Sequence, residues 1–194
     1  MANLKTSYLG LELANPLIVS SNPLTDRADT VADLERAGAS AVVMRSIFEE
    51  QIRADVSEMV KALAGDTSMA AMEYLRADLP GQLGPEAYLE NLAAIRKRVR
   101  IPVIASVNCV AADKWVAYAR KIEQAGADAL ELNLYHMPID PEETGKEVEA
   151  RRLALVQAVL AEVRLPVAVK LSHHYTSLLP FARRLDALGV KGLV

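Results

Sequence analysis

The sequence predicts an α/β fold of the (β/α)8, or TIM-barrel, class. It is present as an incomplete barrel of about five and a half β/α units behind an N-terminal β-hairpin. Two repeated phrases and one polarity gradient support this prediction. The first phrase is a helix end, a glycine turn and a strand, and it occurs at 34–46, 122–134 and 185–194. A glycine just past a helix ends it in the left-handed conformation, and a new strand can follow.

The second phrase is a helix end, a proline and a strand, at 99–108 and 163–172. Proline cannot continue a helix, so the chain must leave it there. Between the strands, 111–125 and 145–163 are amphipathic and long enough to serve as crossover helices. Strands that alternate with such helices must run parallel, with the helices on the outside of the sheet.

These boundaries define the expected elements. The predicted strands are 17–22, 41–46, 103–108, 129–134 and 167–172, with a sixth that begins at 190–194. The opening TSYLGLELANP predicts a hairpin about Leu9-Gly10, 49–64 a helix, and 65–84 an irregular functional loop. A complete barrel takes about 250 residues, so we expect 1–194 to be a single domain, the N-terminal part of a longer barrel.

Composition excludes several classes of protein. The chain is 52% hydrophobic with a net charge of −3, and its one basic run, 96–100, ends a helix, where cations suit the helix dipole. A single cysteine, Cys109, excludes an internal disulfide framework and a multi-cysteine metal site. No apolar stretch approaches the roughly 20 residues of a membrane span. We therefore expect a cytoplasmic protein that acts on a small-molecule substrate, with no nucleic-acid or membrane partner.

The strands share one polar face at their C-terminal ends. In 129–134, one parity carries Ala129, Glu131 and Asn133, whereas the other is leucine throughout. The same parity on all five complete strands gives a predicted mouth of Ser20, Asn22, Arg45, Ser106, Asn108, Asn133, Lys170 and Ser172. Active sites of barrels lie at this end, whereas open doubly wound sheets bind ligands at one switch point. This favours the barrel, and a donor-rich mouth suits an anionic or carbonyl-rich planar ligand better than a metal.

Other interpretations of the same residues stay open. Glu131 is expected to be a counter-ion of Lys170 or Arg45 rather than a catalytic acid, because a buried cation needs a partner. The adjacent His173 and His174 are expected to face solvent. No dinucleotide-binding, P-loop, zinc-protease or serine-hydrolase motif occurs in the sequence, so those chemistries have no support.

Four segments carry a family resemblance. ANPLIVSSNPLT, AVVMRS, AGADALELNLYHMP and LPVAVKLS, in this order, resemble the dihydroorotate dehydrogenase family of FMN-dependent barrels, and most of all its divergent dihydroorotate dehydrogenase-like branch. The resemblance covers essentially the whole chain. It implies FMN as the cofactor and a flavoprotein oxidoreductase of pyrimidine metabolism that acts on a CH–CH bond. It leaves a homodimer open.

The resemblance also implies which residues contact the flavin. They are Ser20, Ser21 and Asn22 at the end of the first predicted strand, Arg45 and Ser46 at the end of the second, Asn108, Asn133 and Lys170. Asn133 matches the asparagine that bonds both flavin and substrate, and Lys170 the lysine near flavin N1 and O2. A fixed cation there favours the reduced flavin, which is negatively charged around N1 and C2=O.

The catalytic residues implied are His136, Asn133 and Lys170. His136 aligns with the family's Cys or Ser base, and Tyr135 replaces the Ser before it. Histidine is a competent base near neutral pH. The family's asparagine-rich substrate motif is not recognisable in 65–84, and its phosphate-binding loops follow strands seven and eight. This chain alone is therefore expected to bind FMN poorly and to be inactive.

Two rival functions remain. Lys170, on an inner strand near a second cation, also suits an aldolase-like barrel that forms a Schiff base with its substrate. The third hypothesis is a non-catalytic barrel remnant. The visible colour of the protein distinguishes a flavoprotein from a non-catalytic remnant. Borohydride trapping on Lys170 tests the Schiff-base hypothesis.

Overall fold

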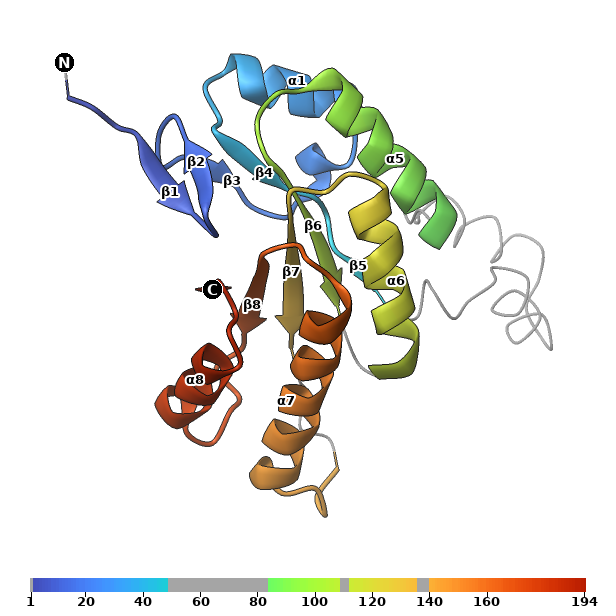
Figure 1. The fold of residues 1–194 in the computed structure, drawn as a ribbon, viewed down its shortest axis with the longest axis vertical. Helices are drawn as coiled ribbons and strands as arrows, with labels where there is room; N and C mark the ends of the chain where they lie inside the picture. Colours follow the sequence, from blue (N-terminus) through green and yellow to red (C-terminus); the bar gives the residue numbers. More distant parts are fainter. Residues whose placement is uncertain (1, 49–83, 109–111, 136–139) are drawn as a thin grey trace, which may run out of the picture.

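The computed structural model describes residues 2–48, 84–108, 112–135 and 140–194 (Figure 1). The strands of its main sheet are β3 (Ile18–Val19), β4 (Ala41–Val43), β5 (Ile47–Phe48), β6 (Val103–Asn108), β7 (Ala129–Leu134), β8 (Val167–Leu171) and β9 (Gly192–Leu193). Their order is β3-β4-β6-β7-β8-β9, with β5 paired to β6, and every pairing is parallel. The predicted helix at 49–64, the loop at 65–83 and Cys109 lie outside the described residues.

Helices cover one face of this sheet. They are η1 (Pro23–Thr25), α1 (Ala28–Arg36), α5 (Pro85–Arg98), α6 (Ala112–Gln124), α7 (Gly145–Glu162) and α8 (Leu178–Ala187). Figure 1 shows α5, α6 and α7 side by side along the sheet, and the two predicted crossover helices are confirmed as α6 and α7. Leu130, Leu132 and Leu134 are buried in the core beneath them, as the parity of the strand predicts.

The incomplete-barrel prediction is confirmed, because successive parallel strands with outer helices form about half of a closed barrel. The glycine of the repeated phrase ends a helix each time. Gly38, Gly126 and Gly189 have φ of 103°, 94° and 93°, a region that glycine adopts without steric cost.

The N-terminal hairpin is also confirmed, and it covers the N-terminal ends of the strands. β1 (Thr6–Tyr8) and β2 (Leu11–Leu13) pair antiparallel about Leu9 and Gly10, whose φ values of 57° and 80° suit a two-residue hairpin turn. A leucine rarely adopts positive φ, at a cost of about 1–2 kcal/mol. Leu9 is only 6% exposed, however, and packs with Ile104 and Ala129. Burial of a leucine stabilises by about 1.5–3 kcal/mol and outweighs the strain.

Two predicted strands were too long. The first ends at Val19, because Asn22 caps η1 instead of extending the strand. The second is interrupted between β4 and β5. Val43 pairs with Ile104 and Ile47 with Val107, so four steps on this segment oppose three on β6, as in a β-bulge.

Candidate active site

The inner face of the sheet changes from apolar to polar along its strands. Strand register aligns its residues in rows across β6, β7 and β8, and the rows toward the C-terminal ends are Ser106–Glu131–Ala168 and Asn108–Asn133–Lys170. Toward the other end, Ile104 faces Ala129 in a cluster that includes Leu9. The structure thus brings three sequence-predicted site residues, Asn108, Asn133 and Lys170, into one row.

A chain of hydroxyl groups crosses this polar half. The Ser21 and Ser46 hydroxyls lie 3.3 Å apart, and the Ser46 N–H donates to Ser21 Oγ at 3.0 Å. Ser46 Oγ lies 2.8 Å from Ser106 Oγ, which donates to Glu131 Oε1 at 3.1 Å. The extra residue between β4 and β5 shifts the side-chain alternation. Parity predicted Arg45 on the inner face, but it is the Ser46 hydroxyl that contacts Ser106 there.

Lys170 lies at the end of this chain. Its Nζ is 3.9 Å from Glu131 Oε1, and Glu131 is 5% exposed. The expectation that Glu131 serves as a counter-ion of Lys170 is therefore confirmed. Arg45 has a different partner, because its guanidinium lies 3.0 Å from Asp26 Oδ2. The sequence showed no sign of this pair, since the two residues are far apart in the chain.

Tyr88 supports the site from the helix layer. Its hydroxyl accepts from the Ser106 N–H at 3.0 Å and donates to the Ser106 carbonyl at 3.2 Å. The interruption between β4 and β5 lies opposite Ser106, and the phenol satisfies backbone groups that a strand neighbour would otherwise bond. Burial raises the pKa of Tyr88 far above its usual value, so its hydroxyl stays protonated. Sequence reasoning missed this residue, because nothing in α5 indicates where its side chain reaches.

The segment after β3 has a local structural role. The Asn22 amide accepts from the Leu24 N–H at 2.7 Å and donates to the Ser20 carbonyl at 2.6 Å. Both ends of this side chain are thereby engaged at the start of η1. Ser20 is exposed. Of Ser20, Ser21 and Asn22, only Ser21 takes part in the hydroxyl chain.

Asn108 has an unsatisfied acceptor. Its Oδ1 is buried and has no hydrogen-bond partner among the described residues, while Asn133 lies opposite on β7 and is half-buried. A buried carbonyl oxygen without a donor is costly, and a ligand N–H would satisfy it. Together with the amide of Asn133 and the ammonium of Lys170, it forms a set of donors and acceptors that fits the edge of a flavin.

The loops beyond β7 and β8 place aromatic groups at the mouth. Tyr135 is 44% exposed and lies edge-on to His174, with ring centroids 5.8 Å apart. His173 and His174 are exposed, as expected. Tyr175 closes the loop on the strands, since its hydroxyl donates to the Leu134 carbonyl at 2.7 Å. His136, the candidate base, lies outside the described residues.

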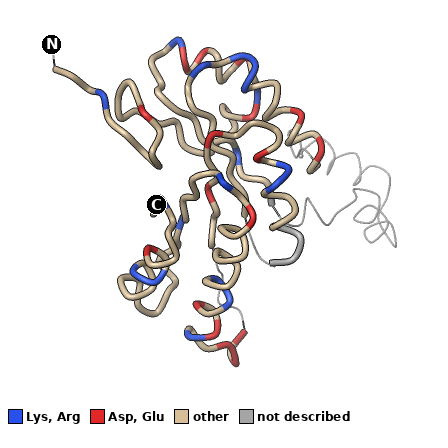
Figure 2. The backbone as a smooth tube through the Cα atoms, viewed as in Figure 1, with Lys and Arg blue, Asp and Glu red and all other residues tan. Residues whose placement is uncertain are grey.

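The other charged residues that the structure describes are mixed in sign. Figure 2 shows basic and acidic residues interspersed along the outer helices instead of gathered in a patch of one sign. Within the described ranges, no three His, Cys, Asp or Glu side chains could hold a metal ion. None of the described helices has the length and apolar character needed to cross a bilayer.

A parallel sheet with outer helices and a polar row at its strand ends is the arrangement of part of a (β/α) barrel. The family model described as dihydroorotate dehydrogenase matches residues 3–194, and the chain belongs to that family. The catalytic subunit of dihydroorotate dehydrogenase B (NAD(+)) from Thermoplasma acidophilum is 32% identical over 94% of this chain. The same subunit from Thermoplasma volcanium is 29% identical over 94% of the chain. The chain spans 59% and 58% of these two relatives.

Solved structures share the fold at lower identity. An IMP dehydrogenase/GMP reductase-like protein from Corynebacterium glutamicum has a TM-score of 0.58 at 17% identity, over 98% of this chain and 47% of its own. A dihydrodipicolinate synthase from Agrobacterium tumefaciens has a TM-score of 0.56 at 18% identity, over 91% of this chain and 52% of its own. At such identities the likeness concerns the fold alone.

Proposed function

We propose that this chain is part of an FMN-dependent oxidoreductase of the dihydroorotate dehydrogenase type. When bound, FMN would supply the chemistry, accepting or donating hydride at flavin N5 against a carbon of a small, carboxylated, pyrimidine-like substrate. The observation that carries this proposal is the row of Asn108, Asn133 and Lys170 at the strand ends, with the unsatisfied Asn108 Oδ1 inside it. Family membership supports it, and no observation favours the Schiff-base or the non-catalytic hypothesis.

Each residue of the row has a distinct role in the proposal. Lys170 holds a positive charge where reduced flavin is negative, around N1 and the C2 carbonyl. Asn133 presents an amide that can donate to one ligand and accept from another, so it orients flavin and substrate together. Asn108 Oδ1 accepts from an N–H group at the flavin edge. Ser21 and Ser46 line the same edge through their hydroxyl groups, with Arg45 held beside them by Asp26.

His136 is the proposed base. It follows Tyr135 in the segment directly after β7, and it would exchange the proton on the substrate carbon next to the one that exchanges hydride. The protein would act in the cytoplasm, without a nucleic-acid or membrane partner. A homodimer is part of the proposal and can be tested by light scattering.

The first experiment is the visible spectrum of the purified full-length protein. A flavin band near about 450 nm supports the proposal. A protein that is colourless, and remains colourless after FMN is added, would refute the proposal. In the same preparation, borohydride reduction with a carbonyl substrate should leave Lys170 unmodified. Trapping on Lys170 would instead establish the Schiff-base alternative.

The second experiment measures reduction of the bound flavin by substrate in stopped flow. His136→Ala should slow it by roughly 100- to 10,000-fold and leave the flavin content intact, because a general base contributes about that factor. His174→Ala is the matched control, since it removes an exposed histidine from the next loop at the mouth. Equal rates in both variants would exclude His136 as the base.

A further inference from the structure

The hydroxyl chain at the mouth has a definite direction. The Glu131 carboxylate can only accept, so Ser106 must give it its single hydroxyl proton. Ser106 Oγ must then accept from Ser46, whose hydroxyl lies 2.8 Å away. With its proton used there, Ser46 Oγ can only accept from Ser21 at 3.3 Å. Every hydroxyl dipole therefore points toward Glu131.

Such a chain stabilises negative charge at its end. Hydrogen bonds in series polarise one another, and the effect is strongest where water is excluded. Ser106 is fully buried and Glu131 is 5% exposed, so solvent screens this part of the site poorly. Tyr88 holds both backbone polar groups of Ser106, which fixes the residue that contacts the carboxylate.

The contact between Glu131 and Lys170 is of intermediate strength. At 3.9 Å the two groups attract each other, but this distance is too long for a hydrogen bond. The ammonium thus keeps its donors for a ligand, while the nearby carboxylate offsets part of its charge. The Lys170 side chain is 38% exposed, whereas that of Glu131 is 7% exposed, so the cation reaches toward the mouth and the anion lies beneath it.

We propose that Glu131, with the chain Ser21–Ser46–Ser106, sets how much of the Lys170 charge acts on a bound flavin. Glu131 and Ser106 are positioning residues, because they act through Lys170 and not on the substrate. The inference rests on the proposed function, in which Lys170 lies beside flavin N1. Its consequence is that this mouth lowers the flavin midpoint potential relative to a site with the lysine alone.

The proposal predicts opposite signs for two charge substitutions. Glu131→Gln removes the offsetting charge, so reduced flavin should bind about tenfold more tightly relative to oxidised flavin, a rise of about 30 mV for a two-electron couple. Lys170→Met removes the cation, and the potential should fall by at least as much. Midpoint potentials are measured by dye-linked titration of the flavin-loaded full-length protein.

The serine chain predicts a smaller shift. In Ser106→Ala, the Glu131 oxygen loses its donor and interacts more fully with Lys170. The potential should therefore fall, by less than in Lys170→Met. Ser46→Ala breaks the chain one link further from the carboxylate and should lower the potential less again.

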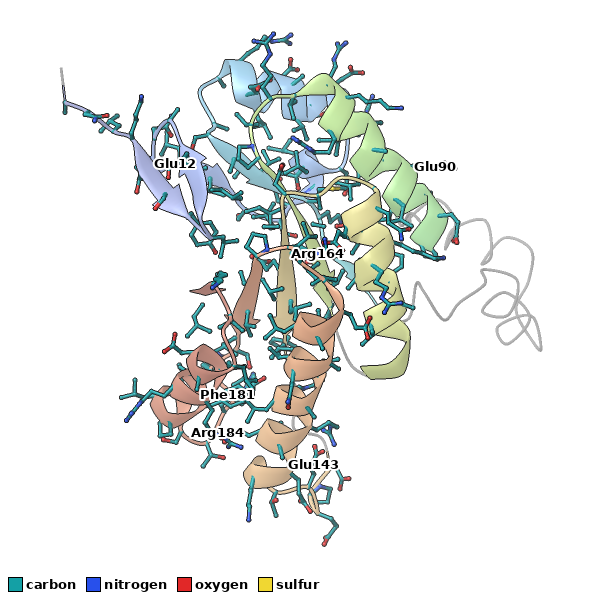
Figure 3. All side chains as sticks on the ribbon, viewed as in Figure 1. Glu12, Glu90, Glu143, Arg164, Phe181 and Arg184 are labelled. Atoms are coloured by element: carbon teal, nitrogen blue, oxygen red, sulfur yellow. The ribbon has the colours of Figure 1, made fainter. Side chains whose placement is uncertain are left out.

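Two controls match these changes. Glu12→Gln removes one negative charge from an exposed position on the hairpin, where Figure 3 labels Glu12. Ser40→Ala removes a buried hydroxyl at the other end of the strands, where Ser40 Oγ bonds the Asn15 carbonyl at 2.5 Å. Both controls should keep the wild-type potential. A shift in Glu12→Gln as large as in Glu131→Gln would attribute the effect to net charge and overturn the proposal.

A measurement without flavin tests the interaction between Glu131 and Lys170 by itself. Urea midpoints of the apoprotein with Glu131→Gln, Lys170→Met and both should be non-additive, because the two groups interact without any ligand. Additive midpoints would refute the interaction itself. If Lys170→Met leaves the flavin potential unchanged, the proposed function fails at Lys170. If it lowers the potential but Glu131→Gln does not raise it, only this further inference fails.

Discussion

The two halves of the inner face are built from the same strands but differ in the polarity of their side chains. Near the hairpin, Ile104 and Ala129 pack with Leu9 in an apolar cluster. Two residues further along the same strands, Ser106 and Glu131 take the same positions in the register. The transition from core to site thus occurs over a single step of the strand repeat.

This difference separates stability from chemistry. The apolar half is closed by the hairpin and can be optimised for packing alone. The polar half has no such cover among the described residues, and its buried polar groups need partners. Tyr88 and the serine chain supply most of these partners, and Asn108 Oδ1 is left for a ligand. Substitutions in the first half should therefore affect folding, and those in the second should affect ligands.

The largest effect on stability is expected from Ile104→Ala. Ile104 is 1% exposed, and truncation of a buried isoleucine to alanine costs about 2–5 kcal/mol. Chemical denaturation should show this loss, with the flavin content per folded molecule unchanged. Ile104→Val is the matched control and should cost about 0.5–1.5 kcal/mol. A large drop in flavin affinity without destabilisation would contradict the division of the face into two halves.

Tyr88→Phe should cause the next largest loss of unfolding free energy. The substitution keeps the ring but leaves the Ser106 N–H and carbonyl without their partner, which costs about 1–3 kcal/mol. Tyr118→Phe serves for comparison, because that hydroxyl donates to the Pro85 carbonyl at the start of α5, away from the strand interruption. Equal losses of unfolding free energy in the two variants would show that Tyr88 has no special role at the interruption.

Asn22→Ala should cost about 1 kcal/mol, the usual value of an N-cap. The residue resembles a flavin contact by its position in the sequence, but its amide is engaged at the start of η1. Asn22→Asp keeps the accepting oxygen and should retain most of the stability. If the aspartate variant is as unstable as the alanine variant, the cap at Leu24 does not stabilise the protein.

Much of the fold could be predicted from local patterns. The glycine and proline turns, the alternation of 129–134 and the hairpin at Leu9-Gly10 are decided by neighbouring residues, and the structure confirms them. The interruption between β4 and β5 could not be predicted in this way. Nothing in AVVMRS distinguishes a continuous strand from one with an extra residue, because the difference lies in the pairing with β6.

The site was predictable to the same extent. The row of Asn108, Asn133 and Lys170 follows from parity and register, which regular strands preserve. The partners of Arg45 and Ser106 do not follow from the sequence, because Asp26 and Tyr88 come from other elements. Strand periodicity carries information along one strand, whereas contacts between layers depend on how helices pack.

The last prediction concerns the pH dependence of stability at Tyr175, which ties the loop after β8 to the end of β7. Burial raises the pKa of this phenol to about 12, with Arg152 lowering it and Glu149 raising it by smaller amounts. The unfolded chain releases this proton at about pH 10, so between pH 10 and 12 the folded state holds more protons than the unfolded state. The free energy of unfolding must then fall as pH rises through this window, and the contribution is constant below it.

Tyr175→Phe removes this titration and leaves the stacking on Phe181 in place. Urea denaturation at several pH values from 9 to 12 should give a shallower loss of stability in the variant, with slopes that differ by at most the value for one proton, about 1.4 kcal/mol per pH unit. Only the slopes are compared, because the variant also loses the hydrogen bond to Leu134 at every pH. Parallel slopes would mean that Tyr175 ionises equally in both states, and that its burial does not raise its pKa in the folded protein.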